Sequence, residues 1–98
     1  MSEAPLTWRD YDPGWLVAET RRQFPGETAL HAALARCTRA AGEEPVIYFV
    51  EPGKDWHIER DVRLKDTPRG DVEIDLLKDG RVGGIEFLNA EWRAGTFG

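Results

Sequence analysis

The alternation of apolar and acidic residues over 71–77, followed by an Asp-Gly pair, constrains the fold more than any other feature of the chain. Val72, Ile74 and Leu76 occupy every second position, and acids occupy the positions between them. Successive side chains of a β-strand point to opposite faces, so this pattern predicts a strand with one buried and one solvent-facing side. Asp79-Gly80 is typical of a type I′ turn, which predicts a returning strand over 81–89.

The stretch 56–64 alternates in the same way and predicts another strand. Its inward residues are expected to be Trp56, Ile58, Val62 and Leu64. Arg60 interrupts this row, which predicts a bend or an exposed end there. The β-branched and aromatic run 46–51 predicts a strand covered on both faces. In the last strand, Gly83-Gly84 is expected to form a bulge or a close backbone approach, because Val82 is out of phase with the apolar residues that follow.

Two helices are predicted before the strands, over 12–24 and 27–42. Asp12 suits the cap of the first helix, and Pro-Gly at 25–26 is expected to end it. The second helix carries an apolar stripe at helical spacing and Gly42 as its left-handed stop. The stripe consists of Leu30, Ala33, Leu34, Cys37 and Ala41.

Together these elements predict an α+β fold, with two N-terminal helices packed on one face of a four-stranded, mostly antiparallel sheet. A chain of 98 residues has room for one core, so we expect a single domain. Its expected parts are a leader (1–11), a helical region (12–42), a β-meander (43–90) and a tail (91–98).

The net charge of −5 is carried entirely by the second part of the chain. Residues 1–42 hold five acids and five bases, whereas residues 43–98 hold thirteen acids and eight bases. An acidic surface repels phosphate backbones, so direct binding of nucleic acid is disfavoured. No apolar run approaches the roughly 20 residues of a membrane span, and the first residues do not resemble a secretory signal. We therefore expect a cytoplasmic protein.

The chemistry-bearing residues nominate no enzyme. A single cysteine, Cys37, excludes an internal disulfide and a multi-cysteine zinc site, and its place in the apolar stripe is typical of a core thiol. His31 is expected at the helix surface or the core edge, and it faces away from Cys37. The His-x-Glu of 57–59 lacks the downstream cysteines of a zinc deaminase. No catalytic residue, metal ligand or cofactor is therefore predicted.

The acids of the sheet are the main candidate site. With strict alternation, five of them share one face: Glu59, Asp61, Glu73, Asp75 and Glu86. Three interpretations stay open: a solvated sheet face, a docking surface for a cationic partner, and general acid/base or metal chemistry, which requires a water-excluding cleft. Trp56 and Trp92 are the candidate anchors of an interface, because tryptophan is enriched at binding hot spots.

The sequence 72–90 resembles the end of a small bacterial domain of unknown function, in which a strand, an Asp-Gly turn and a Gly-Ile-Glu strand close a compact sheet. The matching residues are Asp75, Asp79, Gly80, Gly84, Ile85, Glu86 and Leu88. The extended β-hairpin that begins that domain is replaced here by two helices. The resemblance implies no catalytic residues, because that family has none assigned.

The overall character is also similar to that of small acidic bacterial immunity proteins. That resemblance implies a cytoplasmic, cofactor-free protein that blocks a basic toxin domain, often a nuclease. Our leading hypothesis is therefore a non-enzymatic protein-binding module of the immunity or antitoxin class. The alternative is a small regulatory or accessory domain that self-associates through its sheet, and a metal-assisted hydrolase is a third, weaker hypothesis.

Overall fold

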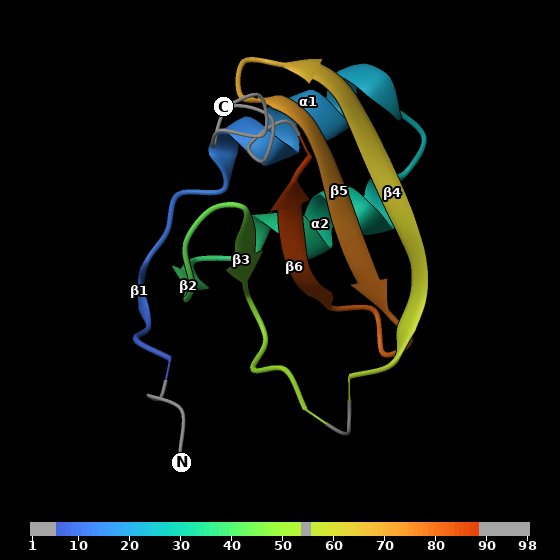
Figure 1. Cartoon of the computed structure of the whole chain (residues 1–98). Coiled ribbons are helices and arrows are strands. Elements are labelled where there is room, and N and C mark those ends of the chain that lie inside the picture. Colours follow the sequence, from blue (N-terminus) through green and yellow to red (C-terminus); the bar gives the residue numbers. More distant parts are fainter. Residues whose placement is uncertain (1–5, 54–55, 89–98) are drawn as a thin grey trace.

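The computed structural model describes residues 6–53 and 56–88 of the chain. Two helices lie behind an antiparallel sheet (Figure 1). In chain order the elements are β1 (Arg9–Asp10), α1 (Gly14–Gln23), α2 (Thr28–Ala35), β2 (Arg39–Ala40), β3 (Val46–Tyr48), β4 (Ile58–Thr67), β5 (Gly70–Leu77) and β6 (Val82–Phe87). Neither described helix has the length and apolar character to cross a bilayer.

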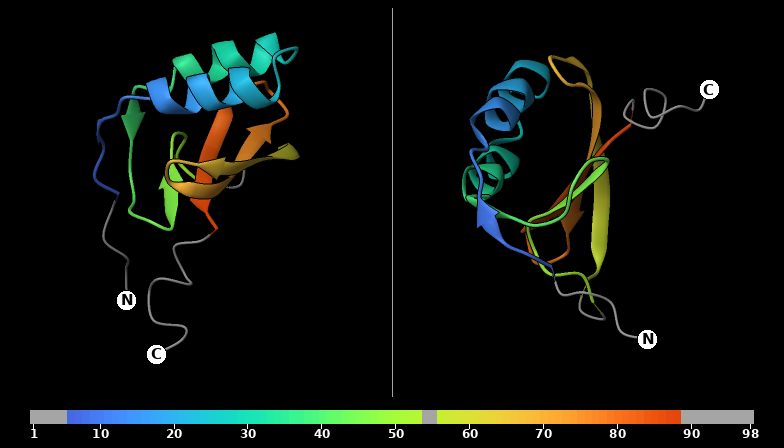
Figure 2. Two further views of the ribbon diagram at one scale, coloured as in Figure 1. Left: turned by 90° about the horizontal axis from the view of Figure 1, so that it is seen from above. Right: turned by 60° about the vertical axis from the view of Figure 1, so that its left-hand side comes forward.

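The main sheet has the strand order β3-β6-β5-β4, and every neighbouring pair is antiparallel. The expected meander holds for β4, β5 and β6, but β3 pairs with β6 rather than with β4. Both helices cover one face of this sheet, with α1 against β4 and α2 against β6 (Figure 2). The predicted α+β class, with its helices N-terminal to the sheet, is confirmed.

The first helix begins and ends close to the predicted limits. The N-cap residue is Pro13 rather than the predicted Asp12, whose carboxylate still accepts a hydrogen bond from the Gly14 amide at 2.9 Å and satisfies one of the free N–H groups of the first turn. The helix ends at Gln23, directly before Phe24 and the turn at 25–26. The Thr20 hydroxyl is buried and donates back to the Leu16 carbonyl at 2.7 Å.

The second helix is shorter than predicted, because it ends at Ala35 rather than at Gly42. The next backbone groups pair with strands: β2 lies against β1, and Ala41 exchanges two hydrogen bonds with Tyr48 at 2.9 and 2.8 Å. All five residues of the predicted stripe are nevertheless buried. Gly42 has the expected positive φ of 89°, but it serves a turn between strands rather than a helix end.

The hairpin between β5 and β6 is confirmed, but its turn type is not the predicted one. Only Gly80 has a positive φ, at 92°, whereas Asp79 does not. The Gly80 amide donates to the Leu77 carbonyl at 2.9 Å, and the Leu77 amide donates to the Arg81 carbonyl at 2.8 Å. Residues 78–80 therefore form a three-residue loop whose last residue, Gly80, is in the left-handed conformation. Such a loop matches the twist of the two strands with one positive φ, whereas a type I′ turn needs two.

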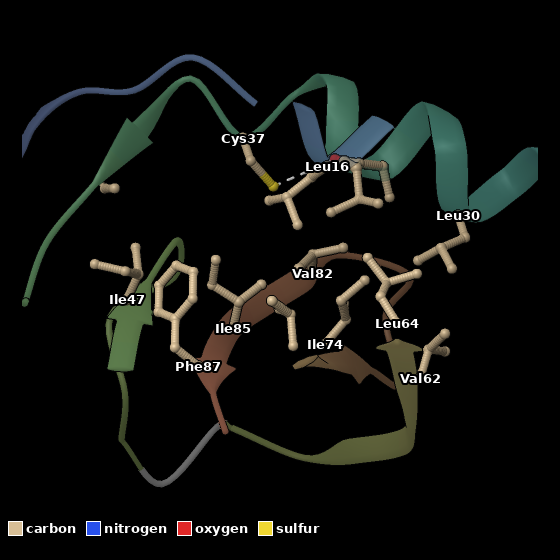
Figure 3. Close-up of a cluster of buried hydrophobic side chains, with 14 residues drawn as sticks. Leu16, Leu30, Cys37, Ile47, Val62, Leu64, Ile74, Val82, Ile85 and Phe87 are labelled. Carbon is tan, nitrogen blue, oxygen red and sulfur yellow. Dashed lines mark hydrogen bonds between the residues drawn. The ribbon is translucent and has the colours of Figure 1, made fainter. Parts of the chain in front are cut away.

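The core lies between the helices and the inner side of the sheet (Figure 3). Leu16 and Leu34 from the helices and Ile74 from β5 are fully buried there. Cys37 is only 6% exposed, and its burial raises the pKa of the thiol to about 12, so the expected core thiol is confirmed. His31 is also buried, and its Nε2 lies 2.9 Å from the Phe24 carbonyl oxygen.

Candidate functional site

The face of the sheet that points away from the helices carries a cluster of carboxylates. Asp61 on β4 lies directly opposite Asp75 on β5, and Glu73 on β5 lies opposite Glu86 on β6. Directly opposed residues project to the same face, about 4.5–5.5 Å apart at Cβ. Val62, Ile74 and Ile85 alternate with these acids and are buried in the core. We call Asp61, Glu73, Asp75 and Glu86 the acidic face.

The carboxylates of the acidic face are close enough to perturb one another. Oxygens of Asp61, Glu73 and Asp75 lie within 4.8 Å of one another. Partial burial, followed by a hydrogen bond with the Asp61 side chain and repulsion from Asp61, Glu73 and Glu86, raises the pKa of Asp75 from its ordinary 3.8 to about 7. Asp75 is therefore partly protonated near neutral pH, unlike an ordinary aspartate.

Basic side chains neutralise little of this charge. Arg63, opposite Glu73, donates to it at 3.3 Å. Among residues 6–53 and 56–88, no lysine or arginine forms an ion pair with Asp61, Asp75 or Glu86. Like charges placed opposite each other destabilise a sheet. The acidic face thus holds a negative excess that the described fold itself does not compensate.

Glu59 does not lie in these rows, because β4 has a bulge at this position. Ile58 pairs with Leu77 and Arg60 pairs with Leu76, which leaves Glu59 exposed and without an opposite residue. The extra residue reverses the alternation, so Ile58 shares the face of Leu77 and is 45% exposed. The predicted inward direction of Ile58 is wrong for this reason.

Trp56 was expected to point into the core, but it lies outside it. The indole packs on the outer side of a second bulge, in β6. Asp75 pairs with Gly84 and Leu76 with Val82, so Gly83 is the extra residue. A Cβ on Gly83 would lie only 2.6 Å from Trp56 Cζ2 and 3.0 Å from Leu77 Cδ2. The predicted bulge is therefore confirmed, and the missing side chain makes room for the indole.

Tyr48, Trp56 and Ile58 form an apolar rim that borders the acidic face, and Leu77 on the same face is buried, at 3% exposure. The rings of Tyr48 and Trp56 meet edge to face, with centroids 5.9 Å apart. Tyr48 lies opposite Gly84, next to Asp75 in the sheet, and a Cβ on Gly84 would lie 2.6 Å from the Ile47 carbonyl oxygen. The close backbone approach predicted at the two glycines is thus present. Sequence reasoning missed Ile58 because its direction depends on the bulge in β4, and Tyr48 because its strand was expected to be covered on both faces.

Trp92, the other predicted anchor, lies outside the described residues. Trp56 is half-buried and contacts Tyr48, which lies in the same row of the sheet as Gly84 and Asp75. Of the five predicted acids, the fold brings four together on one face, and Glu59 stands apart from them at the bulge.

Chemically, the arrangement suits cation binding better than proton transfer. Asp61, Glu73 and Asp75 could supply three oxygens to a divalent ion, but calcium takes six to eight ligands and magnesium six, so water would complete the shell. Acid/base catalysis needs a cleft that excludes water. Two clefts among the described residues are lined by other side chains.

No family model, curated protein or solved structure matches this chain. The acidic face and the apolar rim are therefore interpreted from their geometry and chemistry.

Proposed function

We propose that the chain is a non-enzymatic binding module that docks a basic protein on the acidic face. In its most specific form, the partner is a cationic toxin domain such as a nuclease, and the chain acts as an immunity protein or antitoxin. One observation carries the proposal: Asp61, Asp75 and Glu86 face solvent on the helix-free side of the sheet without an ion-pair partner among the described residues.

Charge complementarity is the first support for this proposal. Partial burial, then a hydrogen bond with Asp61 and repulsion from it, raises the pKa of Asp75, so a lysine or arginine placed between the two carboxylates removes an unfavourable interaction on binding. Such a cation favours the ionised form, and docking should therefore release a proton near pH 7. Opposite charge also speeds association and selects against acidic competitors.

The apolar rim is the second support. Interfaces combine desolvated anchors with surrounding polar contacts, and tryptophan and tyrosine are enriched among the anchors. Ile58 is 45% exposed, and the Trp56 ring packs against Gly83 and Tyr48. A partner that covers the acidic face also reaches this rim, because Tyr48 and Asp75 both neighbour Gly84 in the sheet.

One observation favours a second candidate, self-association through the sheet edge. β4 is an outer strand of ten residues, and an unpaired edge is a template for another strand. The bulge at Glu59 and the charges of Arg60 and Asp61 are features that protect edges from pairing. Sedimentation of the purified chain separates the candidates: a tight homodimer favours the edge, and a monomer favours the acidic face.

The docking proposal is tested by affinity capture from the native host with matched bait proteins. The test bait carries Asp61→Asn, Asp75→Asn and Glu86→Gln. The control bait loses the same number of charges elsewhere, through Glu43→Gln, Glu51→Gln and Asp66→Asn, all at exposed positions.

A basic protein retained by the wild-type chain and the control bait, but lost from the test bait, supports docking on the acidic face. The retained protein is then purified, and its toxicity is measured with and without the chain to test the immunity role. Equal retention by both variant baits would contradict the proposed surface. Docking without relief of toxicity would contradict only the immunity role.

A further inference from the structure

A second, chemically different site lies where the end of α2 meets the chain after β3 and the start of β6. Its cleft has a volume of about 190 Å³. The apolar lining comes from Ala33, Cys37, Phe49, Val50 and Val82. None of these residues belongs to the acidic face or to the apolar rim.

The apolar part of the lining carries no charge at physiological pH. The Cys37 thiol donates to the Ala33 carbonyl at 3.5 Å, and burial raises the pKa of the thiol to about 12. Val82 and Cys37 face the same core region from the sheet and the helix side (Figure 3). A neutral lining of this kind accepts an apolar group rather than a polar one.

Three arginines surround the apolar lining: Arg36, Arg39 and Arg81. Arg39 is paired with Asp10 at 3.4 Å, although the Asp10 side chain is 96% exposed, and Arg81 is paired with Asp79 at 2.7 Å. Arg36 forms no ion pair within the described part of the chain. In a protein of net charge −5, this is a local concentration of positive charge.

We propose that the cleft binds a small amphiphilic anion, with a carboxylate or phosphate head and an apolar body about the size of a benzene ring. The volume of the cleft determines the size of the apolar body, because an apolar cavity of about 150 Å³ already binds benzene. The guanidinium groups select the head, because their N–H donors match carboxylate and phosphate oxygens. Arg36 is the main anchor, since the other two arginines already have carboxylate partners.

The test is a nuclear magnetic resonance titration of the ¹⁵N-labelled full chain. The probes are phenylacetate, phenyl phosphate and the neutral analogue phenylacetamide. We expect at least one anion to shift the amide signals of Ala33, Phe49 and Val82, and phenylacetamide to bind at least about tenfold more weakly. Comparison of the two anions shows whether the head is a carboxylate or a phosphate.

Two variants assign the effect to the cleft. Arg36→Gln is expected to weaken anion binding about tenfold, which corresponds to one charged contact. Arg21→Gln is the matched control, because it removes one exposed arginine near the end of α1, away from the cleft, and its affinity should stay unchanged. The dispersed amide spectrum of each variant verifies that it folds.

Equal binding of phenylacetamide and phenylacetate would overturn the proposal, as would equal losses in the two arginine variants. Absence of any shift at about 10 mM probe would also overturn it, because such a cleft would bind more weakly than the millimolar range.

Discussion

Gly83 determines where the Trp56 indole lies. The backbone of this glycine bulges from β6, and its missing Cβ leaves the space in which the Trp56 ring and the Leu77 side chain lie. A methyl group at this position would overlap the ring, since 2.6 Å is far below a carbon–carbon contact distance. The position of the indole is therefore coupled to a residue with no side chain.

We expect Gly83→Ala to displace Trp56 and to lower the free energy of unfolding by about 1–3 kcal/mol, the range for overpacking. The indole N–H signals and urea denaturation measure the two effects. Gly26→Ala is the control, because nothing lies within 4 Å of a Cβ there, and its stability should change by less than about 1 kcal/mol. An unmoved Trp56 indole signal in Gly83→Ala would refute this packing.

Asp75 should make stability depend on pH in the direction opposite to that of a salt-bridged acid. Its folded-state pKa of about 7 exceeds the ordinary 3.8, so the fold favours the protonated form. The stability from this group is fully present below about pH 4 and is lost as the pH rises through about 7. Because the side chain is partly solvated, we expect the loss to be on the order of 1 kcal/mol.

Asp75→Asn should therefore stabilise the protein at about pH 8 by roughly 1 kcal/mol and change little at about pH 4. Thermal denaturation across this range measures the difference from the wild type. Glu51→Gln, which removes an exposed charge from a loop, should run parallel to the wild type. If Asp75→Asn also ran parallel to the wild type, Asp75 would not be the titrating group.

At the scale of elements, the β5–β6 hairpin depends on the left-handed conformation of Gly80. Its φ of 92° disfavours any side chain, whereas open space surrounds the position, so strain is the dominant effect of a substitution. We expect Gly80→Ala to cost about 1–2 kcal/mol and Gly80→Asn less, because asparagine tolerates this region better. Urea denaturation of both variants measures this order, and an alanine variant as stable as the asparagine variant would contradict it.

Helix and strand identities follow from local periodicity, but their ends and phases depend on distant partners. The apolar stripe of α2 continues past Ala35 in the sequence, yet the backbone leaves the helix to pair with β1 and Tyr48. The strand order has the same origin, since β3 pairs with β6 across the segment 49–81, which contains β4 and β5. Neither of these pairings can be predicted from the local propensity of the sequence.

In the candidate site too, local periodicity predicts some side-chain directions, and others depend on how the strands pair. Asp61, Glu73, Asp75 and Glu86 could be assigned to one face because each lies in an unbroken period of two. Glu59 and Ile58 could not, because one extra residue in β4 reverses the phase before Arg60. The interruption at Arg60 was the available signal, and it indicated a bend without giving its direction.

At the scale of the whole molecule, the layers explain why the acidic face is open. Both helices lie on the same side of the sheet, so the apolar residues of the strands are covered and the acids between them are not (Figure 2). The chain carries its excess of acids in the part that forms this sheet. Long-range attraction of a basic partner and close contact therefore involve the same surface.

The most direct test of the docking account is the association rate of the captured basic partner, measured between about 50 and 500 mM NaCl. For the wild-type chain we expect the rate to fall at least about tenfold over this range, and for Asp61→Asn/Asp75→Asn/Glu86→Gln we expect a low and nearly salt-independent rate. The variant with Glu43→Gln, Glu51→Gln and Asp66→Asn should retain most of the wild-type salt dependence. A wild-type rate that is independent of salt, or one that the acidic-face substitutions leave unchanged, would contradict the account.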